Sequence, residues 1–159
     1  MRIKTLYILI LILFSSCGIR LVNYKKARNL DLNKSYKTLL NKESEIELEK
    51  YYLDPENIID ITANRKTKTL HISQLNKESE SFNLTEIESE EFKKRYNMNN
   101  RDSISLIVMN GILVHKKERK EYRIEHNAIK SLLVLKDADT TILNCSGNEG
   151  KNVLIILTE

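Results

Sequence analysis

Recognisable catalytic and metal-binding motifs are missing from this sequence. Its three histidines, His71, His115 and His126, are not spaced from cysteines or carboxylates as metal ligands are. His71 stands between Leu70 and Ile72 in an alternating stretch, so we expect it to face solvent. The four glycines form no phosphate-cradling loop, and neither a Gly-x-Ser-x-Gly nor a Ser-x-x-Lys motif occurs. We therefore expect no catalytic, cofactor-binding or metal site, and a protein that is not an enzyme.

A long apolar run is also missing, although the chain begins with a short one. Two basic residues, Arg2 and Lys4, precede a largely apolar stretch at positions 6–14, and small residues lead from it to Cys17. This stretch is too short for a membrane-spanning helix, which needs about 20 residues. The layout predicts a secretory signal peptide over residues 1–16.

The end of this leader resembles the lipobox of bacterial lipoproteins. Ser15 and Ser16 directly precede Cys17, and Phe14 stands where the lipobox usually has leucine. The resemblance implies that a diacylglycerol, with acyl chains such as palmitate, is attached to the Cys17 thiol and that the chain is cut before it. An ordinary secretory signal with an incidental cysteine and an uncleaved anchor are the alternatives.

Free cysteines and an excess of charge are scarce in the remaining chain. With Cys17 acylated, Cys145 is the only thiol left, so no intramolecular disulfide can form and the fold depends on its apolar core. The full sequence has 26 basic and 22 acidic residues, a net charge of +4, and loss of Arg2 and Lys4 with the leader lowers it to +2. Together with export, this balance argues against nucleic acid as a partner.

The residues after the expected lipid anchor bear on location. Gly18 is compatible with sorting to the outer membrane, and Arg20 does not fit an acidic surface-export tag. We expect a lipid-anchored outer-membrane protein that faces the periplasm, with exposure at the cell surface left open. Residues 17–34 are polar and basic, which predicts a tether between the lipid and the folded domain.

The next segment predicts short elements. The pattern at 36–52 suits a helix face and a strand about equally, and both remain open. The pair Asp54-Pro55 indicates the start of a short helical turn. Residues 58–73 alternate on both sides of a polar turn and predict a β-hairpin.

A charged segment follows, at 76–102. Thr85 and Glu88 match a capping box, so we expect a helix over residues 86–96. Its inner face is marked by Ile87, Phe92 and Tyr96. The basic run at 116–120 is interpreted as a solvated loop, with contact to anionic lipid headgroups as the alternative.

The last third is the most strongly patterned part of the chain. Apolar strands are predicted at 104–109, 112–114, 131–135 and 153–157, and short helices at 125–130 and 137–143. Asn110-Gly111 is the preferred turn for a two-residue hairpin. These elements predict a single α+β domain over residues 35–159, with a small mixed β-sheet and short helices.

This region, about residues 104–159, resembles the plug domain of TonB-dependent outer-membrane receptors. Asn110-Gly111 stands for the family's Asp-Gly turn, and the sequence VLKDA at 134–138 matches directly. Residues 129–132 stand for its Ile-x-Ser-Ile junction and 153–158 for its closing strand. The chain departs from the family at Asn144-Cys145, which replaces Tyr-Gly, and at Asn152, which replaces glycine.

The resemblance implies a stand-alone plug-like domain, because no barrel sequence follows Glu159 and no TonB-box-like segment is visible near the start. We therefore expect a non-enzymatic lipoprotein that binds an envelope protein partner, such as an outer-membrane receptor or another copy of itself. A small-ligand-binding protein, or an envelope enzyme with a dispersed site, is the alternative. A concave pocket with perturbed titratable groups would favour that alternative, and a flat apolar patch would favour partner binding.

Overall fold

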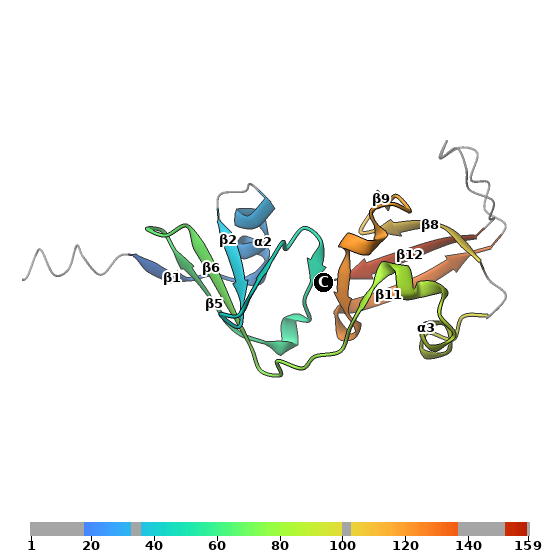
Figure 1. The fold of residues 1–159 in the computed structure, drawn as a ribbon, viewed down its shortest axis with the longest axis horizontal. Coiled ribbons are helices and arrows are strands. Elements are labelled where there is room, and N and C mark those ends of the chain that lie inside the picture. The colour runs from blue at the N-terminus through green and yellow to red at the C-terminus, as the bar shows by residue number, and fades with distance from the viewer. Residues whose placement is uncertain (1–17, 33–35, 100–102, 137–151, 159) are drawn as a thin grey trace, which may run out of the picture. The chain divides into compact units, whose positions relative to one another are not determined.

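The chain forms two compact units, which we describe separately (Figure 1). The computed structural model describes residues 18–32, 36–99, 103–136 and 152–158. Unit 1 comprises the chain up to Glu49 together with Glu56–Lys77, and unit 2 comprises Lys50–Pro55 and the chain from Glu78 onward. The predicted signal peptide, Cys17 and Cys145 lie outside the described residues, as does the predicted helix at 137–143. The prediction of a single domain over residues 35–159 stays a prediction.

Unit 1 contains one five-stranded mixed sheet and the helix α2 (Tyr24–Leu32). The strands lie in the order β1-β5-β6-β2-β3 (Figure 1). Their bounds are β1 Ile19–Leu21, β2 Lys37–Leu40, β3 Ser44–Ile46, β5 Ile58–Asn64 and β6 Thr69–Gln74. Strands β5 and β6 pair antiparallel, and β2 joins β6 in parallel.

The hairpin predicted at 58–73 is confirmed as β5 and β6. One face of the hairpin carries buried aliphatic residues, with Ile61 opposite Ile72 and Ala63 opposite Leu70. The Asn64 side chain accepts hydrogen bonds from two backbone N–H groups of the turn, at Lys66 and Thr67. This is the local bonding by which Asn favours turns.

The segment predicted as a tether is part of unit 1 in the structure. Strand β1 pairs antiparallel with β5, and α2 begins after Asn23, whose side chain accepts a hydrogen bond from the Lys26 N–H. Ala27 on α2 is fully buried. The pattern of β1 did not indicate a strand because Ile19 and Leu21 are 65% and 75% exposed, so its place depends on backbone pairing.

Residues 36–52, for which helix and strand remained open, form strands. Strands β2 and β3 make a hairpin whose turn residues Asn41 and Lys42 both have positive φ, at 52° and 64°. Asp31 on α2 holds this region in place, because its carboxylate accepts from the Leu48 N–H and the Thr38 hydroxyl, both at 2.6 Å. Strand β4 (Tyr51–Tyr52) belongs to unit 2.

Unit 2 contains two mixed sheets, so its fold is α+β, as predicted for the chain. The three-stranded sheet has the order β4-β10-β7 and the four-stranded sheet the order β11-β12-β8-β9. The remaining bounds are β7 Ser81–Asn83, β8 Ile104–Met109, β9 Ile112–Val114, β10 Arg123–Glu125, β11 Ile129–Leu135 and β12 Asn152–Thr158. The helical segments of unit 2 are η2 Leu84–Glu88, α3 Glu90–Arg95, η3 Arg119–Glu121 and η4 His126–Ala128, and the turn η1 Pro55–Asn57 spans the boundary with unit 1.

The four-stranded sheet confirms the predicted strands of the last third. Strands β8 and β9 form the expected hairpin, with Asn110 at φ 50° and Gly111 at φ 82°. Strand β12 lies between β11 and β8, antiparallel to the first and parallel to the second. The chain nevertheless has three small sheets among its described residues, where the sequence analysis expected one.

The helix predicted at 86–96 is divided in two. The first part is the 3₁₀ turn η2, which Asn83 caps in a capping box with Glu86, in place of the predicted pair Thr85 and Glu88. Ser89 then leaves the helical conformation and caps α3 by accepting a hydrogen bond from the Phe92 N–H. The helix predicted at 125–130 is only the short turn η4, because the strand β11 begins at Ile129.

The core of unit 2 lies on one face of the four-stranded sheet. Its fully buried residues include Ile107, Leu154 and Ile156 from that sheet, with Ile87 and Ile124 from the elements packed on it. The predicted inner face of the helical region is confirmed in part. Ile87 and Phe92 are buried, and Tyr96 packs against the cluster as a half-buried side chain.

Candidate functional site

The second face of the four-stranded sheet is aliphatic. Side chains alternate between the two faces of a strand, so the residues between the core positions point to the opposite side. The register aligns Leu133, Ile155, Val108 and Leu113 across all four strands. We call the following set the outer face: Leu106, Val108, Leu113, Leu133, Leu135, Val153, Ile155 and Leu157.

The exposed part of the outer face lies on β11 and β12. Leu133 is 51% exposed, Leu157 44% and Leu135 41%, whereas Leu106 and Val153 are buried. Sheets of this kind normally place polar side chains on their solvated face. Exposed apolar residues that are contiguous, as here, mark surfaces that bind other molecules more often than scattered ones do.

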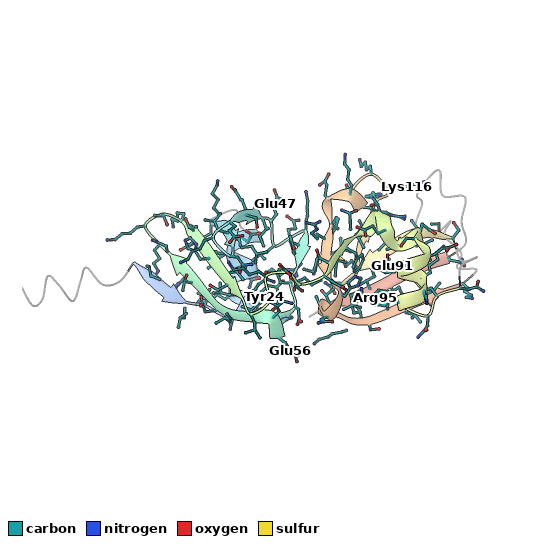
Figure 2. All side chains as sticks on the ribbon, turned by 60° about the horizontal axis from the view of Figure 1, so that its bottom comes forward. Tyr24, Glu47, Glu56, Glu91, Arg95 and Lys116 are labelled. Atoms are coloured by element: carbon teal, nitrogen blue, oxygen red, sulfur yellow. The ribbon has the colours of Figure 1, made fainter. Side chains whose placement is uncertain are left out.

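A pocket of about 610 Å³ lies elsewhere in unit 2, at one side of α3. Its walls come from β7 and the residue before it, from η2 and α3, and from η4. The lining residues are Glu80, Ser81, Phe82, Glu86, Ser89, Glu91, Phe92, Lys94, Arg95 and His126. Glu91 and Arg95 both rise from α3 (Figure 2).

Four rings form an aromatic cluster beneath the pocket. The Phe82 ring lies 4.8 Å from Phe92 and 4.9 Å from His126, centroid to centroid, and it stacks on the imidazole at 28°. Tyr96 lies 4.5 Å from Phe92, and its hydroxyl is 2.7 Å from Nδ1 of His126. The imidazole is therefore held by one stacked ring and one hydrogen bond.

The protonation of this pair follows from its burial. Burial lowers the pKa of the His126 imidazole, and the charge of Arg95 lowers it further. Burial also raises the pKa of the Tyr96 phenol to about 12, so its hydroxyl keeps its proton at neutral pH. A protonated phenol can donate to Nδ1 of a neutral imidazole or accept from it, so the tautomer of His126 decides the direction of this hydrogen bond.

An ion pair stands at the edge of the pocket. Arg95 Nη2 lies 2.6 Å from Glu80 Oε2, and both side chains are largely exposed. The hydrogen bond and the charge of Arg95 together lower the pKa of the Glu80 carboxyl. Since both groups are solvated, the pair adds little to stability and can open at small cost.

The three histidines lie in different surroundings in the structure. His126 lines the pocket, whereas His115 is exposed. His71 lies on the face of β6 opposite Leu70 and Ile72, as expected, but it is half-buried. Within the described ranges, no three His, Cys, Asp or Glu side chains come together as a metal site would require.

The basic run at 116–120 is not a wholly solvated loop. Arg119 is only 6% exposed, and its Nη2 donates to the backbone carbonyl of Ser105 at 2.7 Å. Burial lowers the pKa of this guanidinium. Arg119 is therefore a structural residue of unit 2, and the other basic residues of the run are exposed.

Sequence reasoning did not identify the pocket. Phe92 and Tyr96 were recognised as an inner face, but Phe82, Glu80 and His126 come from other parts of the chain. For the outer face, in contrast, the sequence does contain a signal. The last strands are continuous aliphatic runs, which are typical of strands that are covered on both faces.

In the part of the chain that the structure describes, no helix is long and apolar enough to span a membrane. Comparisons with protein-family models, with characterised proteins and with solved structures find no match to this chain.

Proposed function

We propose that this protein is a lipid-anchored outer-membrane protein whose plug-like C-terminal unit binds an envelope protein partner without catalysing a reaction. The observation that carries the proposal is the outer face, where Leu133, Leu135 and Leu157 are 41–51% exposed on adjacent strands. Contact of these three side chains with water carries an unfavourable hydrophobic free energy. Burial against an apolar partner surface would remove that free energy.

The chemistry of the outer face favours a protein partner. The face is aliphatic, and Ser131 is the polar residue that shares it on β11, opposite Leu157. Protein interfaces have an apolar centre with few charges, which this patch matches. A partner of complementary chemistry presents an aliphatic surface of its own.

The expected anchor supports the same role. A diacylglycerol on Cys17 would hold the chain at the membrane surface and raise its effective concentration toward other envelope proteins. A modest apolar patch is then sufficient for association, because the partners do not have to meet by diffusion in three dimensions.

Affinity capture from detergent-solubilised envelopes tests the proposal. The tagged full-length chain is compared with the double variant Leu133→Glu/Leu157→Glu, which places two charges on the outer face. The matched control is Leu75→Glu, since Leu75 is 76% exposed but belongs to unit 1.

We expect the native chain and Leu75→Glu to retain one and the same envelope protein, and the double variant to lose it. Circular dichroism checks that all variants remain folded. Retention of that protein by the folded double variant would contradict the role of the outer face. Capture that is unchanged in Cys17→Ala would contradict the role of the anchor.

A further inference from the structure

The pocket beside α3 contains two charged side chains, Glu91 and Lys94, that form no ion pair or hydrogen bond within the described ranges, although the charge of Glu91 acts on Arg95 and His126. The other charged side chains of its wall at neutral pH are engaged: Glu80 pairs with Arg95, and Glu86 accepts a hydrogen bond from the Asn83 N–H. The side chains of Glu91 and Lys94, in contrast, have no hydrogen bond or ion pair to any residue in the described ranges.

These two groups have opposite charge and lie close together. They are three residues apart on α3, a spacing that puts their Cβ atoms roughly 5–6 Å from one another on one side of a helix. Long, flexible side chains at this spacing can each reach a separate charged group of one small molecule.

The mixed charge of the wall disfavours ligands of a single charge. A simple anion would meet the carboxylates of Glu86 and Glu91, and a simple cation would meet Lys94 and Arg95. Only a ligand with both charges finds an attractive partner at each end, so the wall selects through repulsion as well as attraction.

The remaining wall is aromatic and suits an apolar ligand side chain. The rings of Phe82, Phe92 and His126 line the pocket, and His126 is fixed by Phe82 and by the Tyr96 hydroxyl. The volume of about 610 Å³ is in the range of small-molecule sites and has room for an amino acid or a short peptide.

We propose that this pocket binds a small zwitterion of the amino-acid class, with the ligand's ammonium at Glu91, its carboxylate at Lys94 and its side chain against His126. The binding is independent of the outer face and of any protein partner. Because Glu91 and Lys94 are exposed, the affinity is weak, with a dissociation constant on the order of millimolar.

An NMR titration of the full-length chain, which follows the His126 imidazole signal, tests the proposal. The probes are L-phenylalanine, phenethylamine and 3-phenylpropionate, which share a ring and differ only in their charges. We expect L-phenylalanine to shift the signal in a saturable way and each analogue to bind about two- to fivefold more weakly.

The variants assign each end of the ligand. Glu91→Gln should remove the preference over phenylpropionate, and Lys94→Gln the preference over phenethylamine. Glu90→Gln is the matched control, because Glu90 is the neighbouring carboxylate of α3 and does not line the pocket; it should change neither preference.

Two outcomes would overturn the proposal. One is the absence of a saturable shift with L-phenylalanine up to about ten times the expected dissociation constant. The other is equal binding of all three probes, which would show that the charges of the wall do not select a zwitterion.

Discussion

The sheets of the two units differ in the face that is turned away from their cores. In unit 1 that face is mixed: the hairpin of β5 and β6 places Thr62, Asn64 and His71 there, and the exposed Ile19 and Leu21 of β1 lie beside Asn64 and Thr62. In unit 2 the four-stranded sheet places aliphatic residues there. Both faces therefore expose large apolar side chains, but in unit 1 polar residues stand between them, whereas in unit 2 the aliphatic residues are continuous across the strands. This continuity is the reason for proposing the outer face of unit 2 as the surface that binds a partner.

The largest effects should come from the core side of the unit 2 sheet. Leu154 and Ile107 are fully buried, so Leu154→Ala or Ile107→Ala should lower the free energy of unfolding by about 2–5 kcal/mol. Leu133→Ala on the outer face should cost well under about 1 kcal/mol, because half of its side chain is already exposed. Denaturant unfolding measures both, and equal costs would remove the distinction between the two faces.

A carboxylate that accepts a backbone hydrogen bond in each unit allows a second comparison. Glu125 in unit 2 is 1% exposed and accepts a hydrogen bond from the Asp54 N–H, while Asp31 in unit 1 accepts from the Leu48 N–H. Glu125→Met leaves the Asp54 donor buried and unpaired, so we expect a loss of about 1–3 kcal/mol.

Asp31→Leu should cost less than Glu125→Met, since Asp31 is only partly buried and water can replace it. Thermal and denaturant unfolding provide the measurement. A larger loss for Asp31→Leu would show that unit 1 depends on its polar contacts more than unit 2 does.

The two hairpin turns should respond in opposite directions. Gly111 has φ 82°, so Gly111→Ala introduces a side chain in a left-handed conformation and should cost about 1 kcal/mol. Lys42 has φ 64° in the corresponding turn of unit 1, and Lys42→Gly relieves that strain. We expect a gain of at most about 1 kcal/mol, reduced by the flexibility of glycine in the unfolded chain. Destabilisation by Lys42→Gly would contradict this account of the turn.

The smallest effect is a dependence on pH that originates in unit 2. The pKa of His126 is lower in the fold than its usual value, so the unfolded chain binds this proton more readily. The contribution of His126 is therefore complete above about pH 6.5 and is lost as the pH falls toward the folded pKa. His126→Phe keeps a ring against Phe82 and should flatten the stability profile between about pH 5 and 7. A native profile that is already flat there would contradict the pKa assignment.

The strands of the last third could be predicted because each one is a largely unbroken run of apolar residues in the sequence. The segment at 104–109, the Asn110-Gly111 turn and the segment at 153–157 each carry a strong local signal, and the structure confirms all three. Strand β1 could not be predicted in the same way, because Ile19 and Leu21 are exposed and only backbone pairing holds them.

The pocket depends on contacts that are distant in sequence. The pairing of β10 with β7 brings His126 into contact with Phe82 and Tyr96, and no local sequence pattern predicts that pairing. The break at Ser89 is a related case. Ser89 and Asn83 each satisfy backbone donors, and these two caps override the single helix that the apolar spacing predicts.

Site-specific photo-crosslinking in intact cells tests the central claim most directly. A photoreactive residue is placed at Leu133 or Leu157 on the outer face of unit 2, and at Ile59 or Leu75 in unit 1, which are 62% and 76% exposed, as controls. We predict one discrete crosslinked envelope protein from both outer-face positions and none from the two controls. Crosslinks of equal yield from all four positions, or none from Leu133 and Leu157, would contradict the claim that the outer face binds a protein partner.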